Sequence, residues 1–455
     1  MNKPTMDMMN DDDLHFPPGF RFGAATSAAQ IEGASRADGK GLSIWDAFCA
    51  TPGRIADASH IDVACDHVHR YREDIERMRW LGLDAYRFSM SWPRVQPQGR
   101  GGWNPAGFAF YDRLVDALLE AGLAPHLTLH HWDLPQALQR DFGGWQARDT
   151  AKFFADYAAE VARRFGPRLA SITTMNEPWC IATKGYQTGE FAPGLQDRAA
   201  AMQVSHHLLL GHGLALQAMR SATSVHTPLG IVLNHTPAFA AERTAADLQA
   251  ARIADGLDVR WYMDPLFRGA YPADVLEHLG RDAPRVQAGD AATIRQPLDF
   301  LGVNFYTRQY ISTRTPPLRA PGHDGFSDMG WEVYPQALTQ HLVRLARDYM
   351  PPPMWITENG MAVADRLVDG RVDDAPRVAY LRAHLAAVAR AIELGVDVRG
   401  YFYWSLLDNF EWDSGYTKRF GLFHVDYATQ ARTAKDSATW YRDFIAGRRA
   451  PREAA

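Results

Sequence analysis

The chain has 455 residues, of which 46% are hydrophobic and 22% are charged, values that are ordinary for a globular protein. Its net charge of −5 excludes the strongly basic balance that binding to nucleic acid or to an anionic membrane surface requires, so we expect neither partner. The three cysteines, Cys49, Cys65 and Cys180, form no CxxC pair, which favours a reducing compartment. We therefore predict a cytoplasmic protein.

The two ends of the chain differ in composition from the rest. Residues 1–15 are acidic and lack the apolar core of a signal peptide, so we predict a disordered tail. Residues 447–455 form a basic, solvated tail. The longest uncharged span, residues 199–219, contains several histidines and glutamines and is predicted to be a buried helix rather than a membrane span. One domain, residues 16–446, remains between the tails.

Eight short apolar segments recur along this domain, and each predicts a buried strand. They cover residues 20–28, 85–92, 125–132, 171–177, 230–235, 300–306, 354–358 and 400–406. Helical patterns alternate with them, notably at residues 66–80, 108–121, 152–165, 199–221, 336–349, 379–394 and 438–445. Strands that alternate with helices form right-handed βαβ units, so we predict a single (β/α)8 barrel with long loop insertions. A doubly wound open sheet is the alternative, which the absence of a glycine-rich phosphate loop after any strand disfavours.

Two of the predicted strands end on a glutamate. Glu358 precedes the turn signal Asn359-Gly360, and Glu177 precedes Pro178, which cannot continue a hydrogen-bonded ladder. The two residues are far apart in the chain, so only a fold that collects its strand ends can bring them together. In a (β/α)8 barrel the active site lies at the carboxyl ends of the strands.

The other predicted strand ends carry hydrogen-bonding groups and tryptophans. They are Gln30, Arg87, His131, Trp132, Asn176, Asn304, Tyr306 and Trp404. Indole rings pack on the apolar faces of sugar rings, while amides, imidazoles and carboxylates pair with hydroxyls. Together with an acidic pair, this set favours cleavage of a glycosidic bond, in which one carboxyl protonates the leaving oxygen and the other attacks or activates water.

Five segments stand out as motifs. Residues 174–178 (Thr-Met-Asn-Glu-Pro) and 357–360 (Thr-Glu-Asn-Gly) contain the two glutamates, and the other three are residues 20–33, 130–135 and 401–412. The five resemble the signature motifs of family 1 glycoside hydrolases, the β-glucosidase family, and the first two resemble its two catalytic motifs. They occur in the family's order and span nearly the whole chain. Ala29 departs from the pattern, since family members commonly have an aromatic residue there, and we expect it to alter local packing rather than chemistry.

The resemblance implies a retaining double displacement, with Glu358 as the nucleophile and Glu177 as the acid/base. Retaining geometry implies carboxyl groups about 5–5.5 Å apart. Arg87 and Tyr306, with support from Asn304, would favour the ionised form of Glu358. Partial burial and the charge of Glu358 would raise the pKa of Glu177.

The resemblance also implies the residues that bind the substrate. They are Gln30, His131, Trp132, Asn176, Trp331, Trp404, Glu411, Trp412 and Phe420. Asn176 would contact the sugar 2-hydroxyl, and Glu411 the hydroxyls at positions 4 and 6. Relatives that act on 6-phosphorylated sugars lack this glutamate because a carboxylate would repel the phosphate, so Glu411 implies an unphosphorylated sugar. Trp331, in the long loop after the sixth strand, would be a platform for the aglycone.

Structural interpretations are preferred for several other residues. Glu32 is expected to be structural, and no HExxH motif or Cys/His cluster accompanies the chain's paired histidines, so no metal and no cofactor are implied. A nucleophilic role for Cys180 is disfavoured because the sequence offers no matching base. Neither composition nor motifs favour a particular oligomeric state.

The leading hypothesis is a retaining β-glucosidase that acts on a small β-glycoside or a short oligosaccharide, with β-galactosyl and β-fucosyl residues as further candidates. A transglycosidase that passes the sugar to an alcohol is one alternative. A non-catalytic sugar-binding barrel is another, which the presence of both glutamates disfavours. A myrosinase-like thioglucosidase is also disfavoured, because those relatives replace the acid/base glutamate.

Overall fold

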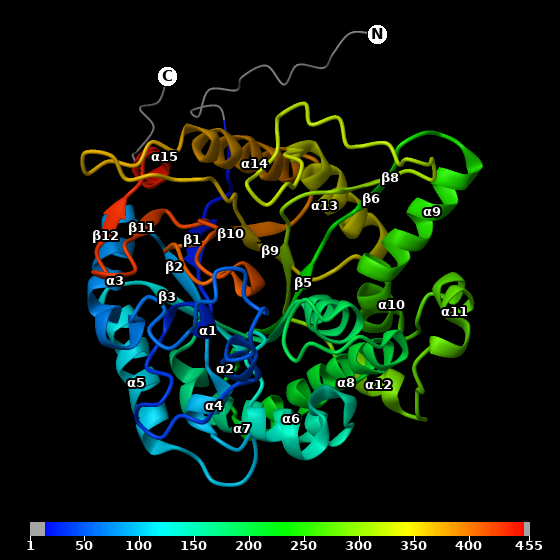
Figure 1. Cartoon of the computed structure of the whole chain (residues 1–455), viewed down its shortest axis with the longest axis horizontal. Helices are drawn as coiled ribbons and strands as arrows, with labels where there is room; N and C mark the ends of the chain where they lie inside the picture. Colours follow the sequence, from blue (N-terminus) through cyan, green and yellow to red (C-terminus); the bar gives the residue numbers. More distant parts are fainter. Residues whose placement is uncertain (1–13, 450–455) are drawn as a thin grey trace.

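The computed structural model describes residues 14–449, which form a closed barrel of eight parallel strands with helices around it (Figure 1). The strands are β1 (Arg21–Ala25), β2 (Ala85–Ser89), β3 (Ala124–His130), β4 (Ser171–Asn176), β5 (Leu229–Asn234), β7 (Phe300–Asn304), β9 (Met354–Asn359) and β10 (Val398–Trp404). They pair in chain order, and β10 closes the barrel on β1 with Arg21 opposite Gly400. The predicted (β/α)8 barrel is confirmed, and the open-sheet alternative is wrong.

The long predicted helices surround the barrel. They are α3 (His67–Leu81), α5 (Pro105–Glu120), α7 (Asp149–Phe165), α8 (Arg198–Ala222), α13 (Pro335–Tyr349), α14 (Ala375–Glu393) and α15 (Asp436–Arg449). Their apolar side chains belong to one core cluster with those of the strands, which is the packing that amphipathic periodicity predicts. The uncharged span of α8 is a largely buried helix. Within residues 14–449, no helix has the length and apolar character needed to cross a membrane.

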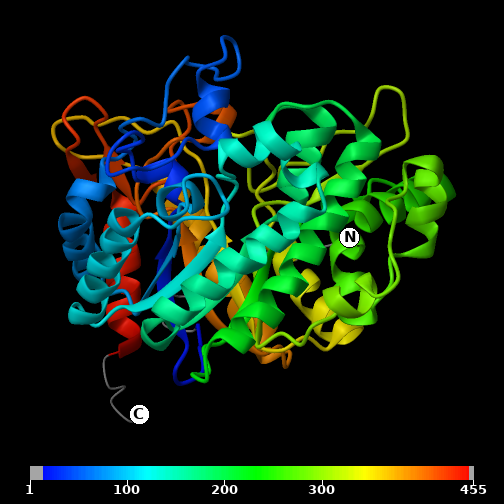
Figure 2. The ribbon, with the colours of Figure 1, turned by 90° about the horizontal axis from the view of Figure 1, so that it is seen from below.

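Shorter elements occupy the loops between strands and helices. The α-helices are α1 (Ala28–Ile31), α2 (Ile44–Cys49), α4 (Trp92–Val95), α6 (Gln136–Phe142), α9 (Ala245–Asp255), α10 (Trp261–Arg268), α11 (Ala273–Leu279) and α12 (Asp290–Ile294). The 3-10 and π-helices are η2 (Gly144–Gln146), η3 (Gly166–Arg168), η4 (Cys180–Thr188), η5 (Gly256–Arg260), η6 (Gly280–Asp282) and η7 (Trp412–Ser414). Helices α9 to α12, drawn in green, lie at one side of the barrel in both Figure 1 and Figure 2.

Two small sheets outside the barrel were not predicted. β6 (Ala238–Ala240) pairs in parallel with β8 (Gln309–Ile311), and β11 (Phe423–Val425) pairs in antiparallel with β12 (Arg432–Ala434). Each strand has three residues, which is too short for a pattern of alternating apolar and polar residues to stand out.

Several barrel strands end before their predicted limits. β1 ends at Ala25, so Gln30 lies in α1 rather than at a strand end. β3 ends at His130, and Trp132 has a φ of 76°, a left-handed conformation that a strand does not contain. The polar and aromatic residues predicted at strand ends therefore lie mostly in the first turn of the following loop.

Parts of both predicted tails lie within the described residues. Leu14, which falls in the predicted N-terminal tail, is buried and belongs to the core cluster. At the other end, α15 continues to Arg449 and reaches into the segment predicted as a tail. Residues 1–13 and 450–455, the remainder of both predicted tails, lie outside the described residues.

A fully buried arginine joins two loops at the carboxyl ends of the strands. Arg377 of α14 pairs with Asp374 and, at 2.8 Å, with Asp365, and all three side chains are inaccessible to solvent. The same guanidinium donates to the carbonyl oxygens of Met361 (3.0 Å), after β9, and Arg419 (2.7 Å), after β10. One cation therefore holds the loops that follow β9 and β10.

Replacing Arg377 by methionine is expected to lower the free energy of unfolding by about 3–5 kcal/mol, because Asp374 would remain buried without its cation. Urea unfolding followed by tryptophan fluorescence would measure the loss. Arg399→Met is a suitable control, since the Arg399–Asp397 pair is more than half exposed, and it should cost less than about 1 kcal/mol. Equal losses in the two variants would contradict a special role for Arg377.

Candidate active site

Two buried glutamates lie at the carboxyl ends of β4 and β9 and are joined by one hydrogen-bond network. Arg87 of β2 donates from Nη1 to Glu358 Oε1 (2.6 Å) and from Nη2 to Asn176 Oδ1 (2.7 Å). Asn304, at the end of β7, donates from Nδ2 to Asn176 Oδ1 (3.0 Å) and to Glu177 Oε1 (2.6 Å). The structure thus brings together the residues that the sequence analysis placed around the acidic pair.

Glu358 is surrounded by donors. Besides Arg87, the hydroxyl of Tyr306 donates to Oε2 at 2.7 Å, so each carboxyl oxygen has its own partner. Burial raises the pKa of Glu358 above its usual value, while the guanidinium of Arg87 and the Tyr306 hydroxyl oppose this effect. Arg87 and Tyr306 therefore favour the ionised form, as expected, although burial outweighs them.

The surroundings of Glu177 favour its protonated form. Burial, followed by the charge of Glu358, raises its pKa to about 7. Hydrogen bonds from Asn304 and from the Cys180 thiol act in the opposite direction. A carboxyl group with a pKa near neutrality can both deliver and accept a proton, which general acid/base chemistry requires.

The backbone is strained where it positions the site. Glu177, Trp132 and Trp412 have φ values of 47°, 76° and 48°, in the left-handed region that residues other than glycine rarely adopt. Gly360 follows the strand that carries Glu358, and a Cβ atom there would lie 1.7 Å from the carbonyl oxygen of Trp404. Only glycine permits this approach, which explains the glycine after Asn359 in physical terms.

Aromatic rings form one wall of the site. His131 stacks on Trp404 and on Trp412 with centroid distances of 5.7 Å and 5.9 Å, and Trp132 packs on Trp412 at 4.4 Å. The indole Nε1 of Trp132 donates to the carbonyl oxygen of Asn176 at 2.9 Å. Trp132 therefore packs on Trp412 and contacts the network through Asn176.

His131 retains an unused nitrogen. Burial, with Arg87 nearby, holds its pKa well below the usual value, so the ring is neutral. Its Nε2 lies 3.2 Å from Asn176 Nδ2, whereas its Nδ1 is buried with no hydrogen-bond partner among the described residues. A neutral ring that accepts at Nε2 carries its proton on Nδ1, so this N–H is a buried donor without an acceptor among the described residues.

The remaining predicted contacts lie around this wall. Glu411, after β10, is half-buried, and burial raises its pKa to about 8. Trp331 and Phe420 lie beside Tyr306, with centroid distances of 5.4 Å and 6.1 Å. Gln30 is tied to the protein, since its Nε2 donates to Asn409 Oδ1 and to the Phe410 carbonyl oxygen, at 3.0 Å and 2.8 Å.

The sequence analysis did not single out Trp179 or Asp258 as site residues. Burial raises the pKa of Asp258 in η5 to about 7, and hydrogen bonds from Trp179 and Gln309 lower it. Trp179 directly follows the Glu177-Pro178 segment and is partly exposed. Its position next to the acid/base candidate in the sequence was a signal that it lies near the site. Asp258 carries no such signal, because η5 lies far away in the chain.

The structural interpretations of other residues agree with the contacts. Glu32 is buried and bonds Arg94 at 2.8 Å and the Tyr111 hydroxyl at 2.5 Å. His206 bonds Tyr271 and Asp290, each at 2.9 Å, and so links α8 to α12. Among residues 14–449, no group of three or more His, Cys, Asp or Glu side chains is arranged to hold a metal ion.

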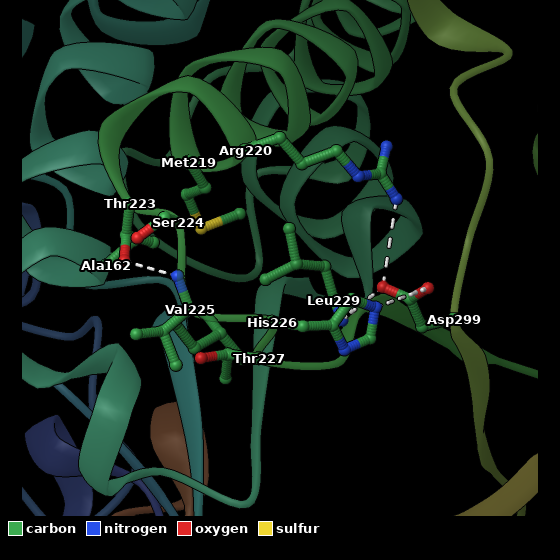
Figure 3. A pocket seen from close by; sticks show the side chains of 11 residues that line it. Ala162, Met219, Arg220, Thr223, Ser224, Val225, His226, Thr227, Leu229 and Asp299 are labelled. Atoms are coloured by element: carbon green, nitrogen blue, oxygen red, sulfur yellow. Dashed lines mark hydrogen bonds and ion pairs between the residues drawn. The ribbon is translucent and has the colours of Figure 1, made fainter.

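A separate pocket of about 190 Å³ lies at the opposite end of the barrel (Figure 3). It is lined by residues that precede or begin strands, among them Leu229 and Asp299, and by the end of α8. Asp299 is engaged there by Arg220 (3.7 Å) and His226 (3.8 Å). The pocket contains no pair of carboxyl groups and lies away from Glu177 and Glu358, so it is not the active-site candidate.

Comparisons with known proteins identify the family of the chain. The family model described as glycosyl hydrolase family 1 matches residues 13–450. The chain is 48% identical to thermostable beta-glucosidase B of Thermobispora bispora, with 95% of this chain and 91% of the relative covered. It is 44% identical to a bifunctional beta-D-glucosidase/beta-D-fucosidase of Bifidobacterium breve, with 95% and 98% covered.

A solved structure has the same fold throughout. The psychrophilic beta-glucosidase BglU from Micrococcus antarcticus is 46% identical and superposes with a TM-score of 0.92, with 97% of this chain and 99% of that chain covered. Sequence identity at this level over nearly the whole length, together with the matching family model, confirms the resemblance noted in the motifs. The chain belongs to glycosyl hydrolase family 1.

Proposed function

We propose that the protein is a retaining β-glucosidase that hydrolyses terminal β-D-glucosyl residues, with Glu358 as the nucleophile and Glu177 as the acid/base. The observation that carries this proposal is the single network in which Arg87, Asn176 and Asn304 connect the two carboxyl groups. Retaining glycosidases need one ionised and one protonated carboxyl group on opposite sides of the scissile bond. The raised pKa of Glu177 and the donors around Glu358 support that division of roles.

In the first step, ionised Glu358 attacks the anomeric carbon while the bond to the leaving oxygen breaks. Glu177 transfers its proton to that oxygen, so the alcohol departs neutral. The carboxylate charge of Glu358 is lost in the new ester bond, and Arg87 and Tyr306 remain in place to receive it again. The sugar is then held as a covalent glycosyl-enzyme.

In the second step, Glu177 acts as a base. Once Glu358 is esterified, the neighbouring charge that raised the pKa of Glu177 is gone, so Glu177 ionises more readily. It accepts a proton from water, and the oxygen of that water attacks the anomeric carbon. The ester bond breaks, Glu358 leaves as a carboxylate, and the two inversions give a product with the β configuration.

The proposed sugar site uses the side chains around the acidic pair. Asn176 and the Nδ1–H of His131, which has no acceptor among the described residues, would pair with hydroxyls, and Trp404 would supply an apolar face. Glu411 would bind the 4- and 6-hydroxyls and would repel a 6-phosphate. Trp132 would position Trp412 and Asn176, which it contacts. Gln30 would position the loop after β10, to which it is hydrogen-bonded.

The proposed ligand is a small β-glycoside or a short oligosaccharide. Trp331 and Phe420 lie beside Tyr306 at the edge of the site, where they would flank the aglycone. The Bifidobacterium relative is named for both glucosidase and fucosidase activity, which makes β-fucosides the next substrates to assay.

We further place the protein in a reducing compartment such as the cytoplasm. What supports this is that Cys49, Cys65 and Cys180 are all buried and form no disulfide.

The test is proton NMR of phenyl β-D-glucoside mixed with the purified protein, recorded before mutarotation becomes significant. We expect β-glucose to appear first, because two displacements at the anomeric carbon restore its configuration. If α-glucose appeared first, the proposal of a covalent intermediate on Glu358 would be wrong. Release of phenol together with a new alkyl glucoside when methanol is added would measure the transglycosidase alternative. Binding without release of phenol would favour the sugar-binding barrel.

A further inference from the structure

We propose that Cys180 is a positioning residue for the acid/base glutamate: its thiol donates a hydrogen bond that orients the Glu177 carboxyl group and stabilises its ionised form. The inference rests on the proposed function, in which Glu177 is the acid/base. Cys180 Sγ lies 3.1 Å from Glu177 Oε2, and both residues are more than nine-tenths buried. The sequence analysis considered Cys180 only as a nucleophile, a role that this contact does not support.

The bond completes the set of donors on Glu177. Asn304 Nδ2 donates to Oε1 at 2.6 Å, and the thiol donates to Oε2, so each carboxyl oxygen has one partner. The backbone N–H of Cys180 also donates to the carbonyl oxygen of Glu177 at 3.0 Å. This local turn, which opens η4, fixes the sulfur beside the carboxyl group. Cys180 also lines a small pocket with mainly apolar residues such as Ile44 and Trp145, and with His130, while the hydrogen bond that its thiol makes is the one to Glu177.

A thiol suits both halves of the proposed reaction. Burial, followed by the charge of Glu177, raises the pKa of the Cys180 thiol well above its usual value, so the thiol stays protonated and remains a donor. S–H is a weak donor. It therefore supports the carboxylate when Glu177 must act as a base, without holding that carboxylate so strongly that Glu177 can no longer be protonated when it must act as an acid.

The other two cysteines make different contacts. The Cys65 thiol donates to the backbone carbonyl oxygen of Asp408 at 3.1 Å. The Cys49 thiol is influenced by the charges of Asp46 and Asp62 but, among the described residues, makes no hydrogen bond to a carboxyl side chain. Among the described residues, Cys180 is therefore the cysteine whose thiol bonds a carboxyl side chain. Cys49, which is also buried, offers a matched control.

Other charged and titratable groups face this pair from each neighbouring element. Glu358 comes from β9, Arg87 from β2, Tyr306 from the loop after β7, and Glu411 from the loop after β10. Lys184 of η4 and Tyr262 of α10 interact with Cys180. All of these residues are retained in a Cys180 variant. A shift in the pKa of Glu177 would therefore report on the loss of the thiol.

The experiment compares the pH dependence of kcat/KM for phenyl β-D-glucoside in wild type, Cys180→Ala and Cys180→Ser. Loss of the donor destabilises ionised Glu177, so the alkaline limb of Cys180→Ala is expected to move to higher pH by about half a unit to one unit. Serine restores a hydroxyl donor at the same position, so its limb is expected to return toward wild type. Cys180→Val, which also lacks a donor but fills more of the space, should shift in the same direction as alanine.

Two controls separate this effect from a structural one. Cys49→Ala should leave the limb at its wild-type position. With 2,4-dinitrophenyl β-D-glucoside, whose leaving group needs no proton, kcat/KM of Cys180→Ala should differ little from wild type at any pH.

The outcomes distinguish this inference from the proposed function. If wild type shows the alkaline limb and Cys180→Ala and Cys180→Val show it at the same pH, the role of Cys180 is overturned while the proposed function stands. Equal shifts in the serine and alanine variants would also overturn it, because the shift would then follow from packing and not from the donor. A wild-type protein that releases no phenol would instead overturn the proposed function, and the present inference with it.

Discussion

Glu358→Gly is expected to lower kcat/KM for an aryl β-glucoside by about 10⁴- to 10⁶-fold, the scale observed when a catalytic nucleophile is removed. The variant lacks the proposed nucleophile, and the charge that Arg87 and Tyr306 engage is also lost. Steady-state release of the aryl alcohol would measure the loss. Thermal unfolding would establish that the variant is folded.

Azide makes this result specific. Glycine leaves a space where the nucleophile was, so azide added to Glu358→Gly should attack from that side and give the α-glucosyl azide in a single inversion. Glu393→Gly, at the exposed end of α14, should keep wild-type activity and give no azide adduct of α configuration. Activity of Glu358→Gly within tenfold of wild type would refute the nucleophile assignment.

Glu177→Gln is expected to lower kcat/KM for phenyl β-D-glucoside by about 10²- to 10⁴-fold, the usual contribution of general acid catalysis. In wild type, protonated Glu177 is the active form in the first step, so kcat/KM should fall as the pH rises through its pKa of about 7. Glutamine cannot titrate, so this alkaline limb should disappear from the profile. A limb that persists unchanged in Glu177→Gln would belong to another group.

The dependence on the leaving group and the anomer of the azide product distinguish the role of Glu177 from that of Glu358. Glu177→Gln should form the glycosyl-enzyme rapidly from 2,4-dinitrophenyl β-D-glucoside, because that leaving group departs without a proton. Azide should then displace the enzyme from the intermediate and give the β-glucosyl azide. The same anion would thus give opposite anomers with the two variants, a result that exchange of the two proposed roles would reverse.

Contacts between distant strands account for most of what these experiments probe. Arg87 and Glu358 are 271 positions apart in the chain, and Asn304 and Glu177 are 127 apart, yet both pairs are joined at 2.6 Å. The loop positions are held in turn by Arg377, whose guanidinium reaches the carbonyl oxygens of Met361 and Arg419. The stability of the loops and the geometry of the acidic pair therefore depend on the same closure of the barrel.

The sequence by itself determined the kind of fold and the chemistry of the site. Alternation of apolar strands with amphipathic helices is a local pattern, set by which side chains avoid water, and it predicted the barrel. Glu177 before a proline and Glu358 before Asn359-Gly360 are local as well, because these residues end a strand through their own backbone limits. Motif order along the chain then indicated the family.

Only the tertiary structure decided which atoms meet. Three such contacts are the bond of Gln30 to the loop after β10, the packing of Trp132 on Trp412, and the bond of the Cys180 thiol to Glu177. They depend on register and on the strained turns after the strands. Propensity and periodicity act over a few residues, whereas these contacts depend on how eight strands close into a ring. The positions of these side chains follow from the packing of the whole chain, and a local sequence pattern carries no information about that packing.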